Sequence, residues 1–235
     1  MATFYCFDTK QWMTGLPPVE LALEEPNGLL AQGGDLSVET LLDAYRHGVF
    51  PWYSDDQPPL WWSPNPRAML RPSEIHISRS MRRFLRKLSW EISFDRDFRA
   101  VITACAAPRD GHPGTWITRE MIDAYCALHV GGHAHSIECW NGNELVGGIY
   151  GVAVGQVFFA ESMFSRATNG SKVALVALCD YLTEWGYQLI DCQIPNPHLL
   201  SLGVKMLSRS DFSALLSSAC DRLPTQDAWE HRGTL

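Results

Sequence analysis

The sequence predicts an α+β protein with a small N-terminal mixed α/β domain, residues 1–70, and a larger C-terminal domain, residues 71–235, built on a mixed sheet. Three patterns favour this division. Pro and Gly turns crowd the first 36 residues, and apolar residues at helical spacing dominate from about 78 to 130. From His133 onward, apolar residues alternate as they do in strands.

The composition indicates a globular chain with an excess of negative charge. Of its 235 residues, 46% are hydrophobic and 19% are charged, and the net charge is −7. This charge argues against nucleic-acid binding over the whole surface but allows a local basic face. The seven Cys form no Cys-x-x-Cys pair, and no signal peptide or membrane-length apolar run is evident, so we expect a reduced, cytoplasmic protein.

Start and stop signals place the helices. Ser37 can cap a helix from about Val38 to His47, which Gly48 ends. The segment from Leu60 to Arg67 is expected to be a loop or edge segment, because its prolines cannot donate to a sheet ladder. Further helices are predicted at 79–88, 98–106, 118–130, 171–185 and 211–220.

Alternating apolar residues place the strands. Trp90 to Phe94 alternates, and so does His133 to Trp140, which ends in the hairpin signal Asn141-Gly142. A loop is predicted at 111–114, and further strands are predicted at 144–154, 157–161 and 187–193. The three-strand meander from His133 and the strand that follows the helix 171–185 are expected to form one sheet.

Two polar side chains end the apolar run Tyr187–Ile190. Strand alternation puts Asp191 and Gln193 on one face and Cys192 on the other. Burying a carboxylate is costly unless it has a partner, so the pair is expected to hold a cationic or hydrogen-bonding guest, such as a reacting amine. The alternative is an aspartate that caps the following loop.

Other residues can border a pocket. Glu161 ends an apolar strand, where it lies at a pocket mouth or faces water. Trp52 and Trp116 follow turn residues and either fill the core or stack on a guest. His133 and His135 share a strand face without a closed four-ligand pattern, so no metal site is expected.

The helix 79–88 concentrates positive charge in an otherwise acidic chain. Phosphate recognition needs such a local surplus, because affinity comes from neutralising backbone charges. A solvated helix face is the alternative. The cations are Arg79, Arg82, Arg83, Arg86 and Lys87.

The order of meander, loop and helix from about 134 to 185 suggests the core of an acyl-CoA N-acetyltransferase (GNAT-type). In that class, N–H groups at a helix N-terminus hold a pyrophosphate. The loop Arg166–Ser171 lacks the glycine spacing usual there. The topology therefore fits this class and the cofactor loop does not.

A series of motifs runs in order from about residue 24 to 205. They are Glu25-Pro26-Asn27-Gly28-Leu29-Leu30-Ala31, Gly33-Gly34-Asp35-Leu36, Gly48-Val49-Phe50-Pro51-Trp52, Trp61-Trp62-Ser63-Pro64, Gly114-Thr115-Trp116-Ile117-Thr118, Gly132-His133-Ala134-His135-Ser136-Ile137-Glu138, Glu161-Ser162-Met163-Phe164-Ser165, Ile190-Asp191-Cys192-Gln193 and Ser201-Leu202-Gly203. Together they resemble the leucyl/phenylalanyl-tRNA–protein transferase family. Asn65, where relatives often have Asp, and Asn196-Pro197-His198 depart from its pattern.

The resemblance implies an aminoacyltransferase that moves Leu, Phe or Met from aminoacyl-tRNA to proteins beginning with Arg or Lys, which marks them for degradation. It implies an acetyltransferase-like domain that uses neither CoA nor another cofactor. A CoA-dependent N-acetyltransferase and a non-catalytic adaptor that binds tRNA or degrons are the rival interpretations.

The resemblance also implies roles for individual residues. The implied catalytic residues are Asp191, Gln193 and Glu161. The implied pocket for the amino-acid side chain comprises Phe158, Ile149, Leu175 and Leu178, and Trp52, Trp116 and Tyr45 would surround the 3′-terminal adenosine. The basic helix would meet the acceptor stem. Asp191 either takes the proton of the attacking amine or anchors the charge of the acceptor's Arg or Lys.

Overall fold

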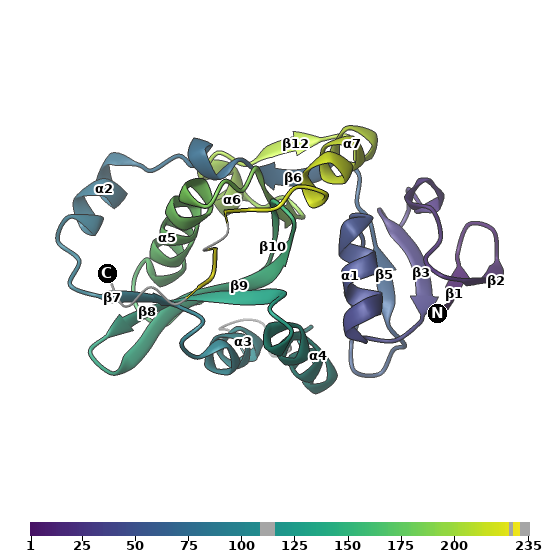
Figure 1. Cartoon of the computed structure of the whole chain (residues 1–235), viewed down its shortest axis with the longest axis horizontal. Helices are drawn as coiled ribbons and strands as arrows, with labels where there is room; N and C mark the ends of the chain where they lie inside the picture. Colours follow the sequence, from purple (N-terminus) through teal and green to yellow (C-terminus); the bar gives the residue numbers. More distant parts are fainter. Residues whose placement is uncertain (109–115, 226–227, 231–235) are drawn as a thin grey trace.

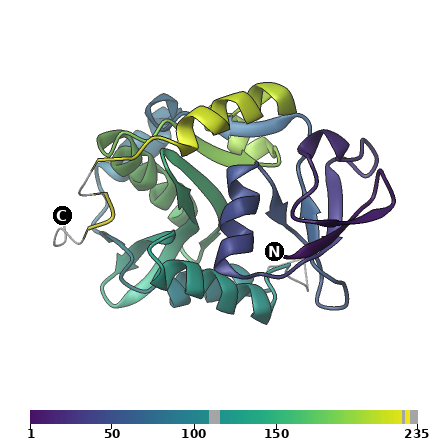
Figure 2. The ribbon, with the colours of Figure 1, turned by 45° about the vertical axis from the view of Figure 1, so that its right-hand side comes forward.

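The computed structural model describes residues 1–108, 116–225 and 228–230, so the predicted loop 111–114 lies outside the described residues. The chain forms two sheets, with helix α1 (Val38–Arg46) standing between them (Figures 1 and 2). The prediction of α1 is confirmed: the Ser37 side chain accepts from the Thr40 N–H, and Gly48 follows the helix with φ +72°.

The first sheet is small and antiparallel, with the strand order β2-β1-β3-β5-β4. Its strands are β1 (Thr3–Cys6), β2 (Gln11–Thr14), β3 (Leu29–Gly33), β4 (Phe50–Pro51) and β5 (Leu60–Trp62). The expectation of a loop or edge segment is wrong for Leu60–Trp62, which pairs with β3 on one side and β4 on the other. Its neighbouring prolines all lie just outside the strand, where they remove no ladder hydrogen bond.

The second sheet has the order β12-β6-β11-β10-β9-β8-β7 and is mixed, because β10 and β11 run parallel and the other pairs are antiparallel. Its strands are β6 (Arg67–Leu70), β7 (Glu91–Phe94), β8 (Ala134–Asn141), β9 (Glu144–Val154), β10 (Val157–Ser165), β11 (Leu189–Gln193) and β12 (Lys205–Leu207). The predicted hairpin and the strand after the long helix are confirmed, whereas β6 and β12 were not predicted. The chain enters this sheet between Trp62 and Arg67, and the domain division at residue 70 stays a prediction.

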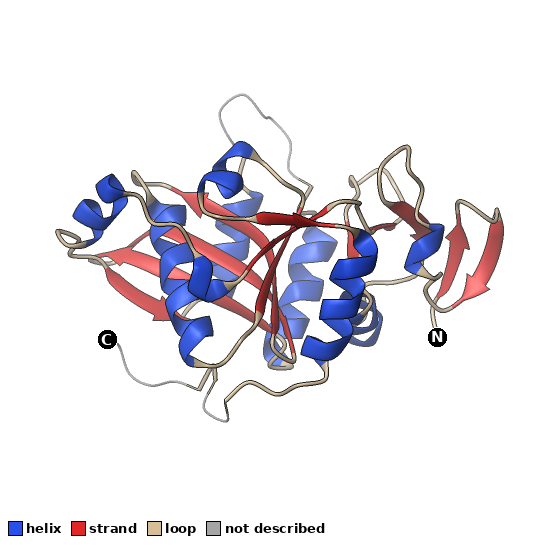
Figure 3. Ribbon diagram, turned by 90° about the horizontal axis from the view of Figure 1, so that it is seen from above, coloured by secondary structure: helices blue, strands red, loops and turns tan. Residues whose placement is uncertain are grey.

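Helices cover both faces of the second sheet (Figure 3). They are α2 (Arg79–Leu85), α3 (Phe98–Ala106), α4 (Arg119–Val130), α5 (Gly170–Glu184), α6 (Pro197–Ser201) and α7 (Arg209–Cys220), with 3-10 turns η1 (Val19–Leu21) and η2 (Pro72–Glu74). Helix α5 packs its apolar side on one face, in a core with Ile149, Phe158 and Ile190. Helices α1, α3, α4 and α7 contribute to the core on the other face.

The second sheet opens between its two parallel strands. Pairing of β10 with β11 covers Val157–Phe159 and Leu189–Asp191. Beyond it the register shifts between Ala160 and Ser162 on β10 and between Asp191 and Gln193 on β11, where Gln193 has φ +58°. Two polar side chains, Glu161 and Gln193, therefore lie where regular pairing ends.

No helix in the described ranges is long and apolar enough to cross a membrane.

Candidate active site

A cavity of about 310 Å³ occupies the opening between β10 and β11. Its lining is mostly apolar, and Glu161 and Gln193 are among its polar residues. The lining residues are Phe50, Pro51, Trp52, Trp116, Ile149, Ala160, Glu161, Ser162, Met163, Leu175, Cys192, Gln193, Ile194, Asn196 and Leu199. An apolar pocket with a few convergent polar groups is typical of a small-ligand or reaction site.

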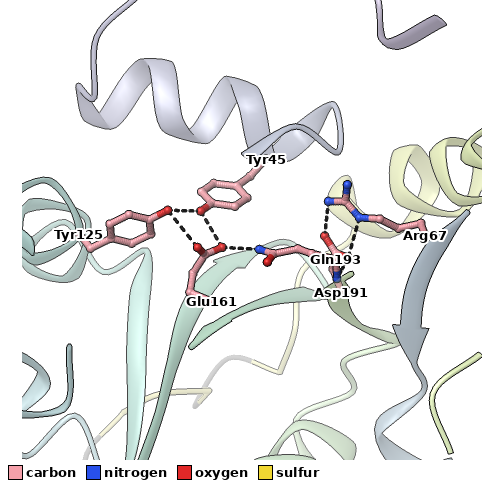
Figure 4. Close-up of polar contacts among 6 residues, drawn as sticks. All are labelled: Tyr45, Arg67, Tyr125, Glu161, Asp191 and Gln193. Carbon is pink, nitrogen blue, oxygen red and sulfur yellow. Dashed lines mark hydrogen bonds and ion pairs between the residues drawn. The ribbon is translucent and has the colours of Figure 1, made fainter. Parts of the chain in front are cut away.

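Glu161 is buried and held by hydrogen bonds from three elements (Figure 4). Its Oε1 accepts from the Tyr45 hydroxyl of α1 and from Gln193 Nε2, both at 2.7 Å. Its Oε2 accepts from the Tyr125 hydroxyl of α4 at 3.1 Å. Burial raises the pKa of Glu161 from 4.5 to about 7 against the lowering effect of these donors, with a smaller contribution from the charge of Asp191. Of the two positions that the sequence left open for Glu161, a pocket mouth and open water, the structure shows the first.

Asp191 does have the cationic partner that its burial requires, but the partner belongs to the chain. Its Oδ1 accepts from Arg67 Nε at 2.9 Å and its Oδ2 from Arg67 Nη2 at 2.6 Å, in a bidentate pair (Figure 4). Both side chains are buried, at 1% exposure for Arg67 and 0% for Asp191. The guanidinium lies over the rings of Phe50 and Phe212, at 4.9 and 5.0 Å from their centroids.

Asp191 also controls the backbone of Gln193. Its Oδ1 accepts from the Gln193 N–H at 2.9 Å, across the bulge where Gln193 takes its positive φ. The carboxamide of Gln193 donates to Glu161, and both residues line the cavity. Asp191 thus lies under the site and fixes the residue that faces it.

The residues expected around the aminoacyl group occupy two layers. Ile149 and Leu175 line the cavity, whereas Phe158 and Leu178 are fully buried behind it, in the core on the α5 side. Trp52, which is 41% exposed, and Trp116 both line the cavity. Tyr45, expected beside them, is fully buried in the hydrogen bonds of Glu161.

The five cations of the basic segment 79–87 are all exposed. Helix α2 is shorter than predicted and ends at Leu85, so Arg86 and Lys87 follow it. Within the described residues, none of the five takes part in an ion pair. Figure 1 places α2 at the end of the second sheet opposite α1.

Sequence reasoning missed two residues of this site. Arg67 follows the cis Asn65–Pro66 bond in a proline-rich stretch, and its partner is 124 positions away. Tyr125 has the spacing of an ordinary core residue in α4, where nothing distinguishes its hydroxyl. The sequence offered one indication of Arg67, which is that it is the single cation among the mostly apolar residues 60–70.

Comparisons with known proteins agree over most of the chain. The family described as leucyl/phenylalanyl-tRNA protein transferase matches residues 69–217, and its N-terminal domain matches residues 34–65. Proteins called leucyl/phenylalanyl-tRNA–protein transferase are 56% identical in Pseudomonas fluorescens (strain SBW25) and 57% in Azotobacter vinelandii, each over 213 residues, or 91% of this chain and 94% of the relative. That of Pseudomonas putida (strain W619) is 56% identical over 93% of this chain and 98% of its own length.

One solved structure also aligns, at a much lower level. It is that of L-PGS from Bacillus licheniformis, with a TM-score of 0.37 and 12% identity, over 68% of this chain and 51% of that chain. A TM-score of this size does not define a shared fold.

Proposed function

This chain belongs to the leucyl/phenylalanyl-tRNA–protein transferase family, and from that premise we propose that it moves Leu, Phe and Met from aminoacyl-tRNA to the α-amino group of cytoplasmic proteins that begin with Arg or Lys. The observation that carries the proposal is the cavity between β10 and β11. It combines an apolar lining and two tryptophans with polar residues that include Glu161 and Gln193. Such a site suits an apolar amino acid esterified to a nucleoside.

Each part of the aminoacyl-adenosine end has a matching surface. The apolar side chain would lie against Ile149 and Leu175, and the adenine would stack on Trp52 and Trp116. Apolar pockets distinguish one methylene by only about 1–3 kcal/mol, which suits an enzyme that accepts several apolar side chains. Phe158 and Leu178 would set the depth of the pocket from behind, and Tyr45 would support its polar edge through Glu161.

The proposed reaction is aminolysis of an ester. The acceptor's α-amine attacks the aminoacyl carbonyl, the C–N bond forms, and the ribose oxygen of the tRNA departs. Positioning supplies much of the acceleration, because the ester is already activated. Glu161 and Gln193 are the catalytic residues we propose, since both border the cavity. Asp191 we assign a positioning role, because it reaches the site through the Gln193 backbone and its charge is balanced by Arg67.

The sheet supports a GNAT-type arrangement for the C-terminal part. Its central parallel strands separate after Asp191, and helix α5 crosses between them, as the meander–loop–helix order suggested. The α5 N-terminus carries no glycine-spaced loop, which fits a donor that brings its acyl group on tRNA and not on CoA.

The test of this function is a transfer assay. The protein is incubated with labelled Leu-tRNA, Phe-tRNA or Met-tRNA and with peptides that begin with Arg, Lys or Ala. Label is expected on the Arg and Lys peptides and absent from the Ala peptide. Acetyl-CoA as the donor is the control, and acetylation of the peptides, or tRNA binding without transfer, would contradict the proposal.

We further propose that the basic segment 79–87 meets the tRNA acceptor stem. Neutralising Arg82, Arg83 and Arg86 together is expected to weaken tRNA binding and to flatten the slope of log affinity against log salt by roughly 0.7–0.9 for each phosphate left without its cation. Filter binding at several salt concentrations measures the slope. Arg96→Gln is the control, since it removes an exposed arginine that pairs with Glu91 elsewhere. An unchanged slope in the triple variant would contradict the proposal and would mean that the cations of the basic segment only face solvent.

A further inference from the structure

Three oxygen-bearing side chains meet in one buried cluster beside the cavity: Tyr45, Tyr125 and Glu161 (Figure 4). The two tyrosines are fully buried, and Glu161 is 8% exposed. Each group contacts both others, with 2.7 Å from Tyr45 to Glu161, 3.1 Å from Tyr125 to Glu161 and 2.5 Å between the two hydroxyls. All three distances join atoms within hydrogen-bonding range.

The number of protons in this cluster depends on the charge of Glu161. Each tyrosine has one hydroxyl proton and an ionised Glu161 has none, so only two of the three contacts can be hydrogen bonds at one time. A neutral Glu161 brings the third proton, and the three groups then form a closed ring in which each donates once and accepts once. The cluster can therefore hold Glu161 in either state: both hydroxyls donate to the carboxylate, and the third proton closes the ring once Glu161 has taken it up.

The surroundings favour uptake of that proton near neutral pH. Burial raises the pKa of Glu161 to about 7, and the pKa values of Tyr45 and Tyr125 lie well above their usual range, mainly through burial and the charge of Glu161. Tyr150 on β9 faces the same carboxyl and also has a raised pKa. On β11, Gln193 donates to Glu161, and the charge of Asp191 is balanced by Arg67 of β6.

We propose that Glu161, held between Tyr45 and Tyr125, takes the proton from the acceptor's α-ammonium and so produces the amine that attacks. This inference rests on the proposed function and assigns the base of the same site. Glu161 borders the cavity, whereas Asp191 is covered and paired. Tyr45 and Tyr125 are positioning residues, because they act on the substrate only through Glu161.

The step balances as follows. An N–H bond of the ammonium breaks and an O–H bond of Glu161 forms, which leaves a neutral amine. The nitrogen lone pair forms the C–N bond at the ester carbonyl and the C–O bond to the ribose breaks. A second N–H proton passes to the departing ribose oxygen, giving an amide and a ribose hydroxyl. Glu161 releases its proton to water when the products leave.

The proton transfer from the α-ammonium to Glu161 has an equilibrium constant near one, because the two groups have similar pKa values. An α-amino group has a reference pKa of roughly 7.7–8.0, about one unit or less above that of Glu161. A base with a pKa near the working pH is the most effective in general base catalysis. An ordinary exposed Glu, with a pKa near 4.3, would be too weak a base by roughly three units.

The first test follows Glu161 in the free protein. An infrared pH titration is expected to show a buried carboxylic acid that ionises near pH 7, and Glu161→Gln is expected to lose this signal. The glutamine side chain keeps a donor for the ring and an acceptor for Tyr45 and Gln193, so the fold should persist. Absence of a carboxylic acid that titrates near pH 7 would overturn the proposal without bearing on the transferase activity.

The second test follows transfer to an Arg-beginning peptide. The kcat/KM of the wild type is expected to rise with pH through about 7 as Glu161 ionises, and to level off once the acceptor's α-amine is itself neutral, above roughly pH 7.7–8. Glu161→Gln is expected to lose the rising limb at about 7, with activity lower by about 10²–10⁴-fold. Retention of that limb in Glu161→Gln would overturn the proposal.

Single tyrosine variants separate a positioning role from a merely structural one. The Tyr125 hydroxyl lowers the pKa of Glu161, so Tyr125→Phe is expected to move the rising limb to higher pH. Tyr53→Phe is the matched control, because it removes a tyrosine–carboxylate bond to Glu120, outside the ring, and should leave the limb in place. If the wild type itself does not transfer, the proposed function fails, and the infrared titration still decides the state of Glu161.

Discussion

Arg67→Met is expected to lower the free energy of unfolding by about 3–5 kcal/mol and to remove most of the transfer activity. The change leaves the Asp191 carboxylate fully buried without its counter-charge, and each of its oxygens loses the hydrogen bond from Arg67. A carboxylate in that state draws water or moves, and the Gln193 N–H that it holds moves with it. Chemical denaturation measures the first effect and the transfer assay measures the second.

The double variant Arg67→Met with Asp191→Asn separates the two roles of Asp191. Both charges are then gone, and the asparagine oxygen can still accept from the Gln193 N–H. We expect part of the stability to return and transfer to recover well above the level of Arg67→Met. If Asp191 were itself the proton acceptor, the double variant would stay inactive, because a carboxamide cannot take a proton at neutral pH.

The helices and the central strands were predictable because their signals are local. The predicted helices begin after capping residues, Ser37, Ser78 and Thr118. In each case the side chain accepts a hydrogen bond from the backbone N–H three residues further on. The Asn141-Gly142 signal likewise marks the β8–β9 hairpin, in which Asn141 pairs with Glu144 across Gly142 and Asn143. Each of these caps and turns depends on residues a few positions apart in the sequence.

The strands β6 and β12 depend on distant partners. Strand β6 is four residues long, follows two prolines and is paired to β11 and β12 from far along the sequence. Nothing within it marks the partner. Strand β3 was missed for the same reason, since its partners β1 and β5 both lie far from it in the sequence.

The candidate site was predictable in its positions and less so in its chemistry. The burial argument for Asp191 required a cationic or hydrogen-bonding guest, whereas the partner in the structure is Arg67 of the chain itself, which charge spacing did not indicate. The sequence left Glu161 either at a pocket mouth or in water, and it did not show the burial by the helices of Tyr45 and Tyr125 that raises the pKa of Glu161. Strand alternation placed Asp191 and Gln193 on one face and Cys192 on the other, which is wrong, because the bulge at Gln193 breaks the alternation and Gln193 lines the cavity beside Cys192 while Asp191 does not. The packing of α1 and α4 against β10 gives Glu161 its tyrosine partners.

Ala160→Leu is expected to reduce transfer of Phe by at least about 100-fold, because the larger side chain takes space that the donor needs. Ala160 lines the cavity and is partly exposed, so the change adds about three carbons to the lining without overfilling a closed core. A single methylene in such a pocket is worth about 1–3 kcal/mol, or roughly 10–200-fold. Transfer of the smaller Leu is expected to fall less.

Ala153→Leu is the matched control. Ala153 is a partly exposed alanine on the neighbouring strand β9, and it packs against the same core from outside the cavity lining. The variant should transfer Phe and Leu at close to the wild-type rates.

We expect the cavity between β10 and β11 to hold the amino-acid side chain of the tRNA-borne donor. Single-turnover transfer of labelled Phe and Leu from tRNA to an Arg-beginning peptide, by the wild type, Ala160→Leu and Ala153→Leu, tests it directly. We predict a large loss in Ala160→Leu alone, greater for Phe than for Leu. Transfer of Phe at the wild-type rate by Ala160→Leu would contradict the claim.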